Sequence, residues 1–333
     1  MHTFSLAKLL LPAGLLAGMA AGLADTTLRG PVLGYVLDAR SHSIRAVNGI
    51  PGAATLAAPV PLPFAVERAA FSSASDFALV IGSEDRTLYL IRNLDTTAPA
   101  AWAISGALPG IDRVVLSAAN TSAALYSSRD RRLQVIRGLP AHAEAGPALD
   151  LASLGGELTA LAIDRDGLSV LAAFAGGEVY RVPISGHGGP VEPRPVTRLS
   201  SPSALVLFNG DRDAAIADAA SHQVFLVRDF AGTAETLSLA GERDGISKPV
   251  AVEASADGRR IFVANGGSAS LAVIDLVTHG VEIQGTLDGA PTRIDRLQGR
   301  STFVLNDPGN DALLLLDLSD IVGIYFVPAG REN

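Results

Sequence analysis

The sequence predicts an all-β fold, a seven-bladed β-propeller built from repeats of about 45 residues. One repeat is plain in residues 249–276, where three short apolar strands are separated by an Asp257-Gly258 turn and by a small polar turn. Glycine suits such turns because it accepts positive φ without steric cost. The same order of strands and turns recurs along the chain. Helical spacing of apolar residues is interrupted almost everywhere by Gly, Pro or Asp-Gly, which excludes a helical fold.

The third strand of each repeat gives the period. These strands span residues 44–47, 88–91, 133–136, 179–182, 224–227, 271–274 and 313–316, so their first residues are 44, 45, 46, 45, 47 and 42 positions apart. This spacing matches four short strands per blade. Weaker fourth strands are expected at 54–57, 101–104, 192–196, 236–239 and 281–284. Their weakness is typical of edge strands, which pack on one side only.

Two segments carry a family resemblance. Residues 261–268, Ile-Phe-Val-Ala-Asn-Gly-Gly-Ser, followed by Leu-Ala-Val-Ile-Asp at 271–275, resemble the repeat of YVTN-type β-propellers. The preceding Ser-Ala-Asp-Gly is similar to that family's Ser-Pro-Asp-Gly turn, and residues 34–48 are a second good match. The resemblance covers roughly residues 31–330, with weaker motifs in the other five units. It implies the propeller fold and leaves the function open, because these propellers serve many unrelated tasks.

The ring has to be closed between its last and first blades. The first unit starts with its second strand, near residues 32–37, so its innermost strand is missing. The C-terminal strand, Ile324 to Val327, aligns with the start of the segment 252–259. We therefore expect it to close the ring as the innermost strand of blade one. The alternative makes it the outermost strand of blade seven.

Residues 1–24 are expected to form a signal peptide. Lys8 precedes an uncharged run from Leu9 to Leu23, and Gly22 and Ala24 are small residues at the −3 and −1 positions of a cleavage site. The alternative is an uncleaved anchor, for which a run of about 15 residues is short. Residues 25–333 would then form the propeller domain of a periplasmic or secreted protein. We expect a monomer without a membrane span after cleavage.

Composition narrows the function classes. The net charge of −8 argues against a nucleic-acid surface, which needs a basic face. The absence of cysteine excludes disulfides, thiolate metal sites and cysteine nucleophiles. No haem motif, glycine-rich phosphate loop, nucleophile elbow or zinc constellation is present. We expect no cofactor and no metal.

Candidate sites emerge from equivalent positions in successive repeats. The second strands end at Asp38, Gly82, Ser127, Ala173, Asp218, Asn265 and Asp307, and four residues later stand His42, Arg86, Arg131, Gly177, His222, Ala269 and Asp311. Aspartate here accepts hydrogen bonds from the turn that follows; a cation-binding rim is the alternative. Asp38 with His42, or Asp218 with His222, could orient an imidazole. Blades one and five are not neighbours, however, so these rim loops are expected to be ordinary hairpin tips.

A third set of positions opens the innermost strands. It comprises Glu67-Arg68, Asp112-Arg113, Leu158-Thr159, Ser203-Ala204, Val250-Ala251 and Thr292-Arg293. Arg68, Arg113 and Arg293 belong to blades two, three and seven, which form one arc around blade one. Three guanidiniums at a channel mouth would suit a carboxylate or phosphate, because each presents a planar fork of donors. The alternative is a structural ladder of ion pairs in which Glu67 and Asp112 pair with these arginines.

The function expected from these features is a non-catalytic binding or interaction scaffold. A rigid ring presents loops, so an unknown partner protein or a small anionic ligand would bind at one face. The alternative is a lactonase-like or lyase-like enzyme that acts on an anionic small molecule through the arginine arc. A quinone or other redox cofactor is the least favoured option, since no haem motif or repeated tryptophan is present.

Overall fold

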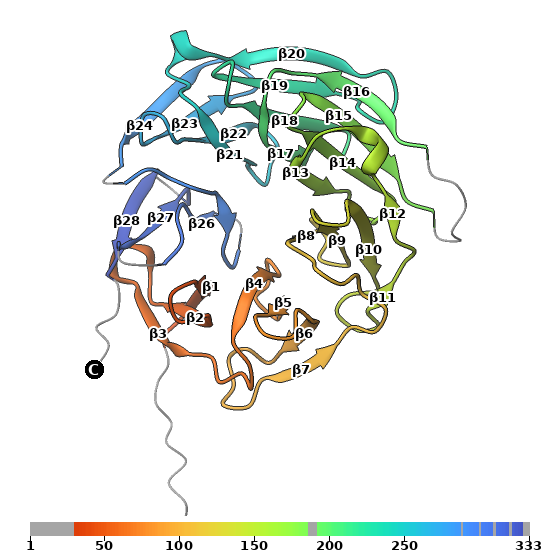
Figure 1. The fold of residues 1–333 in the computed structure, drawn as a ribbon. Coiled ribbons are helices and arrows are strands. Elements are labelled where there is room, and N and C mark those ends of the chain that lie inside the picture. Colours follow the sequence, from red (N-terminus) through yellow and green to blue (C-terminus); the bar gives the residue numbers. More distant parts are fainter. Residues whose placement is uncertain are drawn as a thin grey trace, which may run out of the picture. The chain divides into compact units, whose positions relative to one another are not determined.

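The computed structural model describes residues 30–185, 192–287, 289–299, 301–308, 311–319 and 322–328. Residues 31–333 form the second of two units into which the chain divides, and the predicted signal peptide lies outside the described residues. In the second unit, seven antiparallel sheets follow one another around a ring (Figure 1), which confirms the seven-bladed β-propeller. No helix among the described residues is long and apolar enough to cross a membrane.

Each blade is a sheet whose strands run outward from the centre in chain order (Figure 1). Blade one contains β1 (Val32–Asp38), β2 (Ser43–Asn48) and β3 (Thr55–Pro59). Blade two contains β4 (Val66–Phe71), β5 (Phe77–Gly82), β6 (Leu88–Arg92) and β7 (Ala100–Ala103). Blade three contains β8 (Arg113–Leu116), β9 (Ser122–Ser127), β10 (Arg132–Arg137), β11 (Glu144–Ala145) and β12 (Leu149–Asp150). Blades four and five contain β13 (Leu158–Ile163), β14 (Ser169–Phe174), β15 (Glu178–Pro183) and β16 (Arg194–Arg198); and β17 (Pro202–Phe208), β18 (Asp213–Asp218), β19 (Gln223–Arg228) and β20 (Glu235–Ala240). Blades six and seven contain β21 (Pro249–Ala254), β22 (Arg260–Asn265), β23 (Ser270–Asp275) and β24 (Val281–Thr286); and β25 (Asp295–Arg296), β26 (Thr302–Val304), β27 (Leu313–Asp317) and β28 (Gly323–Val327).

Among the described residues, the core is divided into seven apolar clusters, each between two neighbouring blades. The second strand of a blade supplies residues to the clusters on both of its faces, so β5, β9 and β14 are buried along their whole length. Leu79 and Ile81 of blade two, for example, pack with Leu125 of blade three. Burying one such side chain stabilises the fold by roughly 1.5 to 3 kcal/mol. The ring is therefore held mainly by contacts between blades.

The predicted position of the C-terminal strand is wrong. β28 pairs with β27, with Val327 opposite Leu313, and is the outermost strand of blade seven. The short connection at 318–322 is enough for β28 to pair antiparallel with β27. To reach the inner position of blade one, the chain would have to leave the sheet of blade seven. From the outer position, Val327 and Tyr325 still pack with Val47 and Leu56 of blade one. Blade one consequently has three strands, β1-β2-β3.

The turn that follows β25 occupies part of the place of the missing inner strand. The backbone N–H of Gln298 donates to the carbonyl oxygen of Leu33 in β1 at 2.7 Å, and the N–H of Gly299 donates to that of Ser73 in blade two at 3.2 Å. Gly34 permits this approach, because a Cβ there would lie 3.0 Å from the Cβ of Leu297. Backbone hydrogen bonds from blade seven therefore reach both blade one and blade two.

Candidate functional site

The innermost strands of blades two to five line a cavity of about 350 Å3 at the centre of the ring. Its polar lining side chains are Arg68, Asp112, Arg113, Thr159 and Ser203. Arg68 lies opposite Ile81 and Arg113 opposite Tyr126, which are equivalent positions in the sheets of blades two and three. Because these blades are neighbours, both guanidiniums belong to the same part of the channel wall.

Arg68 and Arg113 have no acidic partner in the described part of the chain. One Nη of Arg113 donates to the carbonyl oxygen of Thr159 at 2.8 Å, which ties the half-buried side chain to blade four. Arg68 is exposed and forms no hydrogen bond or ion pair with a described residue. A guanidinium carries five N–H donors, so most of the donors of both side chains remain available.

The acids beside these arginines are engaged elsewhere. Glu67 forms an ion pair with Arg86 of the β5–β6 hairpin. The carboxylate of Asp112 accepts hydrogen bonds from the backbone N–H of Ser128 at 2.8 Å and from its hydroxyl at 3.1 Å. Arg68 and Arg113 are therefore not part of the ion-pair ladder that the sequence left open as the alternative.

The structure does not bring Arg293 to this cavity. Its guanidinium lies 3.1 Å from the carboxylate of Asp295 and 2.8 Å from that of Asp307, both in blade seven. Arg293 is absent from the lining of the cavity. Of the three arginines in the predicted arc, two face the cavity and one is neutralised within its own blade.

Blades four and five form a wall that offers few free donors. Ala160 and Ala204 occupy the register position of the two arginines, and their small side chains leave room in the cavity. The hydroxyl of Ser203 donates to the carbonyl oxygen of Pro249 at 2.6 Å, and that of Thr159 donates to Ala173 at 3.1 Å. A ligand in this cavity would thus meet two guanidiniums and the hydrogen-bonded carboxylate of Asp112 on one side and a largely apolar surface on the other.

Blade four departs from the predicted equivalences by one residue. Its hairpin between the second and third strands is one residue shorter than that of blade five, since Ala173 pairs with Val179 whereas Ala217 pairs with Val224. Phe174, and not Ala173, therefore stands at the end of the second strand, and Ala160, and not Thr159, is equivalent to Arg68.

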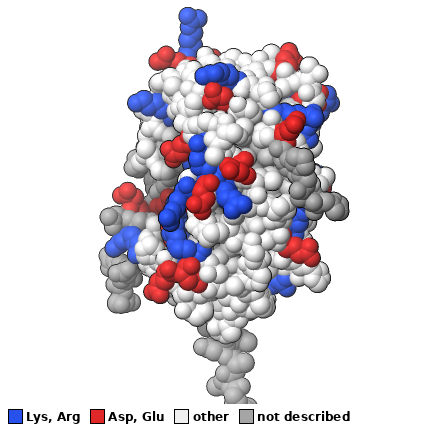
Figure 2. All heavy atoms as spheres, turned by 45° about the vertical axis from the view of Figure 1, so that its right-hand side comes forward, with Lys and Arg blue, Asp and Glu red and all other residues white. Residues whose placement is uncertain are grey.

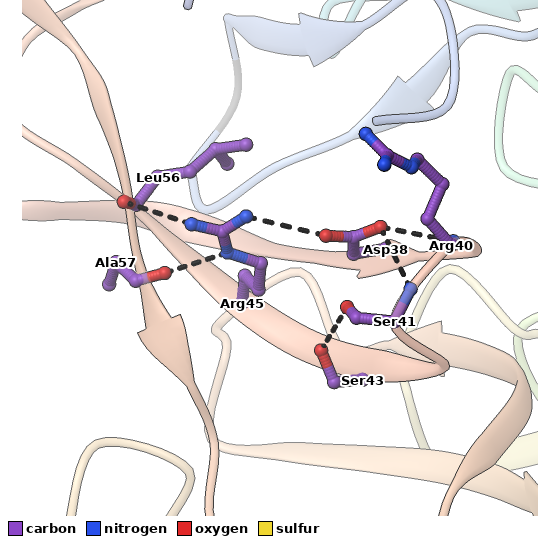
Figure 3. A network of polar contacts seen from close by, with 7 residues as sticks. All are labelled: Asp38, Arg40, Ser41, Ser43, Arg45, Leu56 and Ala57. Atoms are coloured by element: carbon purple, nitrogen blue, oxygen red, sulfur yellow. Dashed lines mark hydrogen bonds and ion pairs between the residues drawn. The ribbon is translucent and has the colours of Figure 1, made fainter. Parts of the chain in front are cut away.

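The aspartates of the rim hold the hairpin turns. The carboxylate of Asp38 accepts the backbone N–H groups of Arg40 and Ser41 and contacts the guanidinium of Arg45 at 3.3 Å (Figure 3). Burial alone would raise the pKa of Asp38, but these hydrogen bonds outweigh it and lower the pKa. This is the turn-stabilising role that the residue type suggests.

Asp218 makes a denser set of contacts than Asp38. One carboxylate oxygen accepts the N–H groups of Ala220 and Ser221 at 3.1 and 2.9 Å. The other accepts those of Ser200 and Ser201 at 2.6 and 2.9 Å, on the loop that enters the inner strand. Burial raises the pKa of Asp218, and the hydrogen bonds lower it further than burial raises it.

The two rim histidines lie at hairpin tips in separate blades. His42 and His222 have φ values of 48° and 54°, in the left-handed region that tight turns require. Nδ1 of His42 lies 3.2 Å from the carbonyl oxygen of Val66, and Nδ1 of His222 lies 3.4 Å from the backbone nitrogen of Lys248. Each imidazole thus contacts the segment that enters the next blade. No group of three or more His, Asp or Glu among the described residues could hold a metal ion.

One charged pair on the inner strands was missed. Glu253 of β21 and Arg296 of β25 form an ion pair of 2.8 Å between blades six and seven. Removal from water raises the pKa of Glu253, and the guanidinium of Arg296 partly offsets this rise. In the sequence, Glu253 stands out as the single charged residue of the apolar run Pro-Val-Ala-Val-Glu-Ala. Blades two, three and five carry alanine or valine at the position equivalent to Glu253.

The surface drawn in Figure 2 mixes charges of both signs. Over the described residues of this face, Lys and Arg lie beside Asp and Glu, and no broad area of one sign is visible. Such a face offers no extended basic surface of the kind that nucleic acids require.

Comparison with known proteins supports the fold alone. No model of a protein family matches the chain, and a search of curated proteins finds no match. A functionally unknown protein from Desulfotomaculum acetoxidans superposes with a TM-score of 0.64 at 13% identity, covering 88% of this chain and 98% of its own. A Bacteroides fragilis protein described as "a putative 6-phosphogluconolactonase" gives a TM-score of 0.64 at 11% identity, with coverages of 89% and 94%. A protein from Lactobacillus plantarum gives 0.64 at 16%, with coverages of 90% and 96%.

Proposed function

We propose that this protein is an exported, non-catalytic binding propeller whose central cavity takes a small anionic ligand carrying carboxylate or phosphate groups. The observation that carries the proposal is the pair Arg68 and Arg113, which occupy equivalent positions of adjacent blades without an acidic partner. Two forked donors in a cavity of about 350 Å3 suit a compact anion. The cavity volume lies in the range of small-molecule sites. The YVTN-type character of the blades belongs to the same proposal and is supported by the motif at 261–275.

A thermal-shift screen of the chain against phosphate, citrate and glycerol 3-phosphate tests this function. A ligand that binds only the folded state raises the melting temperature. We expect a rise with these anions and none with glycerol. Arg68→Gln and Arg113→Gln should each reduce the rise, and Arg212→Gln, at an exposed hairpin tip of blade five, should not. A rise that survives both cavity substitutions would contradict the proposal.

A second candidate is an enzyme acting on an anionic small molecule, lactonase-like or lyase-like. The observation that favours it is Glu253, an inner-strand carboxyl with a raised pKa, because a general acid or base works best when its pKa is shifted towards the working pH. The printed description of the Bacteroides fragilis protein names a lactonase, but the likeness concerns the fold. Hydrolysis of phosphorylated sugar lactones, abolished by Glu253→Gln, would favour this candidate over simple binding.

A further inference from the structure

A second cavity, of about 550 Å3, lies at the seam between blades one and two. Its walls are the tip of the β1–β2 hairpin at Ser41–Ser43, the segment from Pro59 to Val66 that joins β3 to β4, and Glu84 of the β5–β6 hairpin. It shares no lining residue with the central cavity. Its volume is that of a small-molecule site.

The connecting segment is fixed before any ligand arrives. The backbone N–H of Val60 donates to Ile44 at 2.8 Å, and that of Val66 donates to His42 at 2.7 Å. Phe64 stacks on Tyr89 with 4.3 Å between ring centroids. Prolines 59, 61 and 63 restrict φ along the segment. A ligand would therefore bind to an ordered wall and would not have to order it.

The backbone of this wall offers few hydrogen-bond donors. The three prolines have no N–H. The N–H groups of Val60 and Val66 are engaged as described, and that of Leu62 donates to the carbonyl oxygen of Val60 at 2.9 Å. Among the described residues, only the N–H groups of Phe64 and Ala65 in this segment have no partner. The carbonyl oxygen of Ala65 accepts the N–H of Ser83 at 2.9 Å, and the carbonyl oxygens from Pro61 to Phe64 remain as acceptors.

Two side chains of the cavity, His42 and Glu84, add further acceptors, and the hydroxyls of Ser41 and Ser43 hydrogen-bond to each other at 2.7 Å. Nδ1 of His42 faces the carbonyl oxygen of Val66, which can only accept, so Nδ1 carries the hydrogen and Nε2 of the neutral ring keeps a lone pair. Glu84 is exposed and has no hydrogen bond or ion pair with a described residue. The charged neighbours of Glu84 are engaged, since Asp85 accepts the hydroxyl of Tyr89 at 2.6 Å and Arg86 pairs with Glu67. Among the residues that line the cavity, Glu84 carries the only formal charge.

We propose that this cavity binds a small organic amine. The ammonium group would donate to the carboxylate of Glu84 and to Nε2 of His42, because an ammonium has three donors and no acceptor. The apolar part of the ligand would lie on Pro61 and Phe64. The inference is independent of the anion site, since different residues and the opposite charge carry it.

Isothermal titration calorimetry of the chain with hexylammonium chloride at low ionic strength tests the proposal. We expect saturable binding of hexylammonium and none of hexanoate, which has the same chain and the opposite charge. Tetramethylammonium, a cation without N–H groups, should bind more weakly. Glu84→Gln should weaken hexylammonium binding about five-fold, the upper end for an exposed ion pair.

Glu157→Gln is the matched control, because Glu157 is also exposed and its side chain has no partner among the described residues. It should leave amine binding unchanged, as should Arg68→Gln, which separates this site from the central one. Equal binding of hexanoate, absence of hexylammonium binding, or an unchanged affinity in Glu84→Gln would each overturn the proposal.

Discussion

Replacing Asp218 by Asn should destabilise the propeller strongly, although the change is isosteric. The residue is fully buried, and its two oxygens accept four backbone N–H groups from two segments. An asparagine keeps one acceptor oxygen and turns an N–H2 group towards two N–H donors. Two hydrogen bonds to a charged group are lost, at about 1.5 kcal/mol or more each, so we expect a loss of about 3 kcal/mol or more in the free energy of unfolding.

Asp38→Asn is the matched control at the equivalent position of blade one. One oxygen of Asp38 accepts both turn N–H groups, and an amide oxygen could keep these bonds. Only the contact with Arg45, at 3.3 Å, would be lost, which costs about 1 kcal/mol or less for a partly exposed pair. Urea unfolding followed by circular dichroism measures both values. A difference of less than about 1 kcal/mol between the two variants would refute this reasoning.

The same hydrogen bonds predict a dependence on pH. The pKa of Asp218 is lower in the folded chain than its usual value, so the unfolded state takes up the proton more readily. The stabilisation is complete above the unfolded pKa of about 3.9 and is lost as the pH falls through the folded pKa. The stability of Asp218→Asn should therefore fall less steeply below pH 4 than that of the parent chain.

Two further predictions concern the junctions between blades. Gly34→Ala should lower the free energy of unfolding by about 2 kcal/mol, because φ is +146° and the new Cβ would approach Leu297 and the backbone nitrogen of Gln298. Gly210→Ala, at φ +68° with open space around it, should lower it by only about 1 kcal/mol, and equal losses in urea unfolding would argue against close packing at the ring junction. Arg296→Ala should lower the melting temperature at pH 7 more than at pH 4, because the pKa of Glu253 is already raised and the unpaired carboxylate would favour protonation; equal losses at the two pH values would contradict the role of the pair.

The blades were predictable because their signals are local. Each third strand is an apolar run that follows turn residues, and neither feature depends on distant parts of the chain. The place of the C-terminal strand was not predictable in this way. Ile324 to Val327 fits an inner or an outer edge equally well as a sequence, and the choice depends on how its residues pack against the first and last blades.

The candidate site was predicted in part for a related reason. Equivalent positions correctly placed Arg68 and Arg113 on adjacent inner strands, but a fixed spacing failed in blade four, where the hairpin is one residue shorter. The ion pair of Arg293 with Asp307 was within reach of the sequence, because both residues belong to the same repeat. The prediction that the second strand of this repeat ends at Asp307 is wrong, since β26 ends at Val304 and Asp307 lies in the loop beyond it. Ion pairs within a blade therefore have to be identified before arginines of different blades are assigned to one binding site.

The most direct test of the central claim is calorimetric titration of citrate into the chain and into the double variant Arg68→Gln/Arg113→Gln. Each guanidinium should contribute about 1.5 kcal/mol or more through charge-assisted hydrogen bonds. The double variant should therefore bind citrate roughly 100-fold more weakly, or not measurably. An affinity within about three-fold of the parent value would mean that the central cavity is not the anion site.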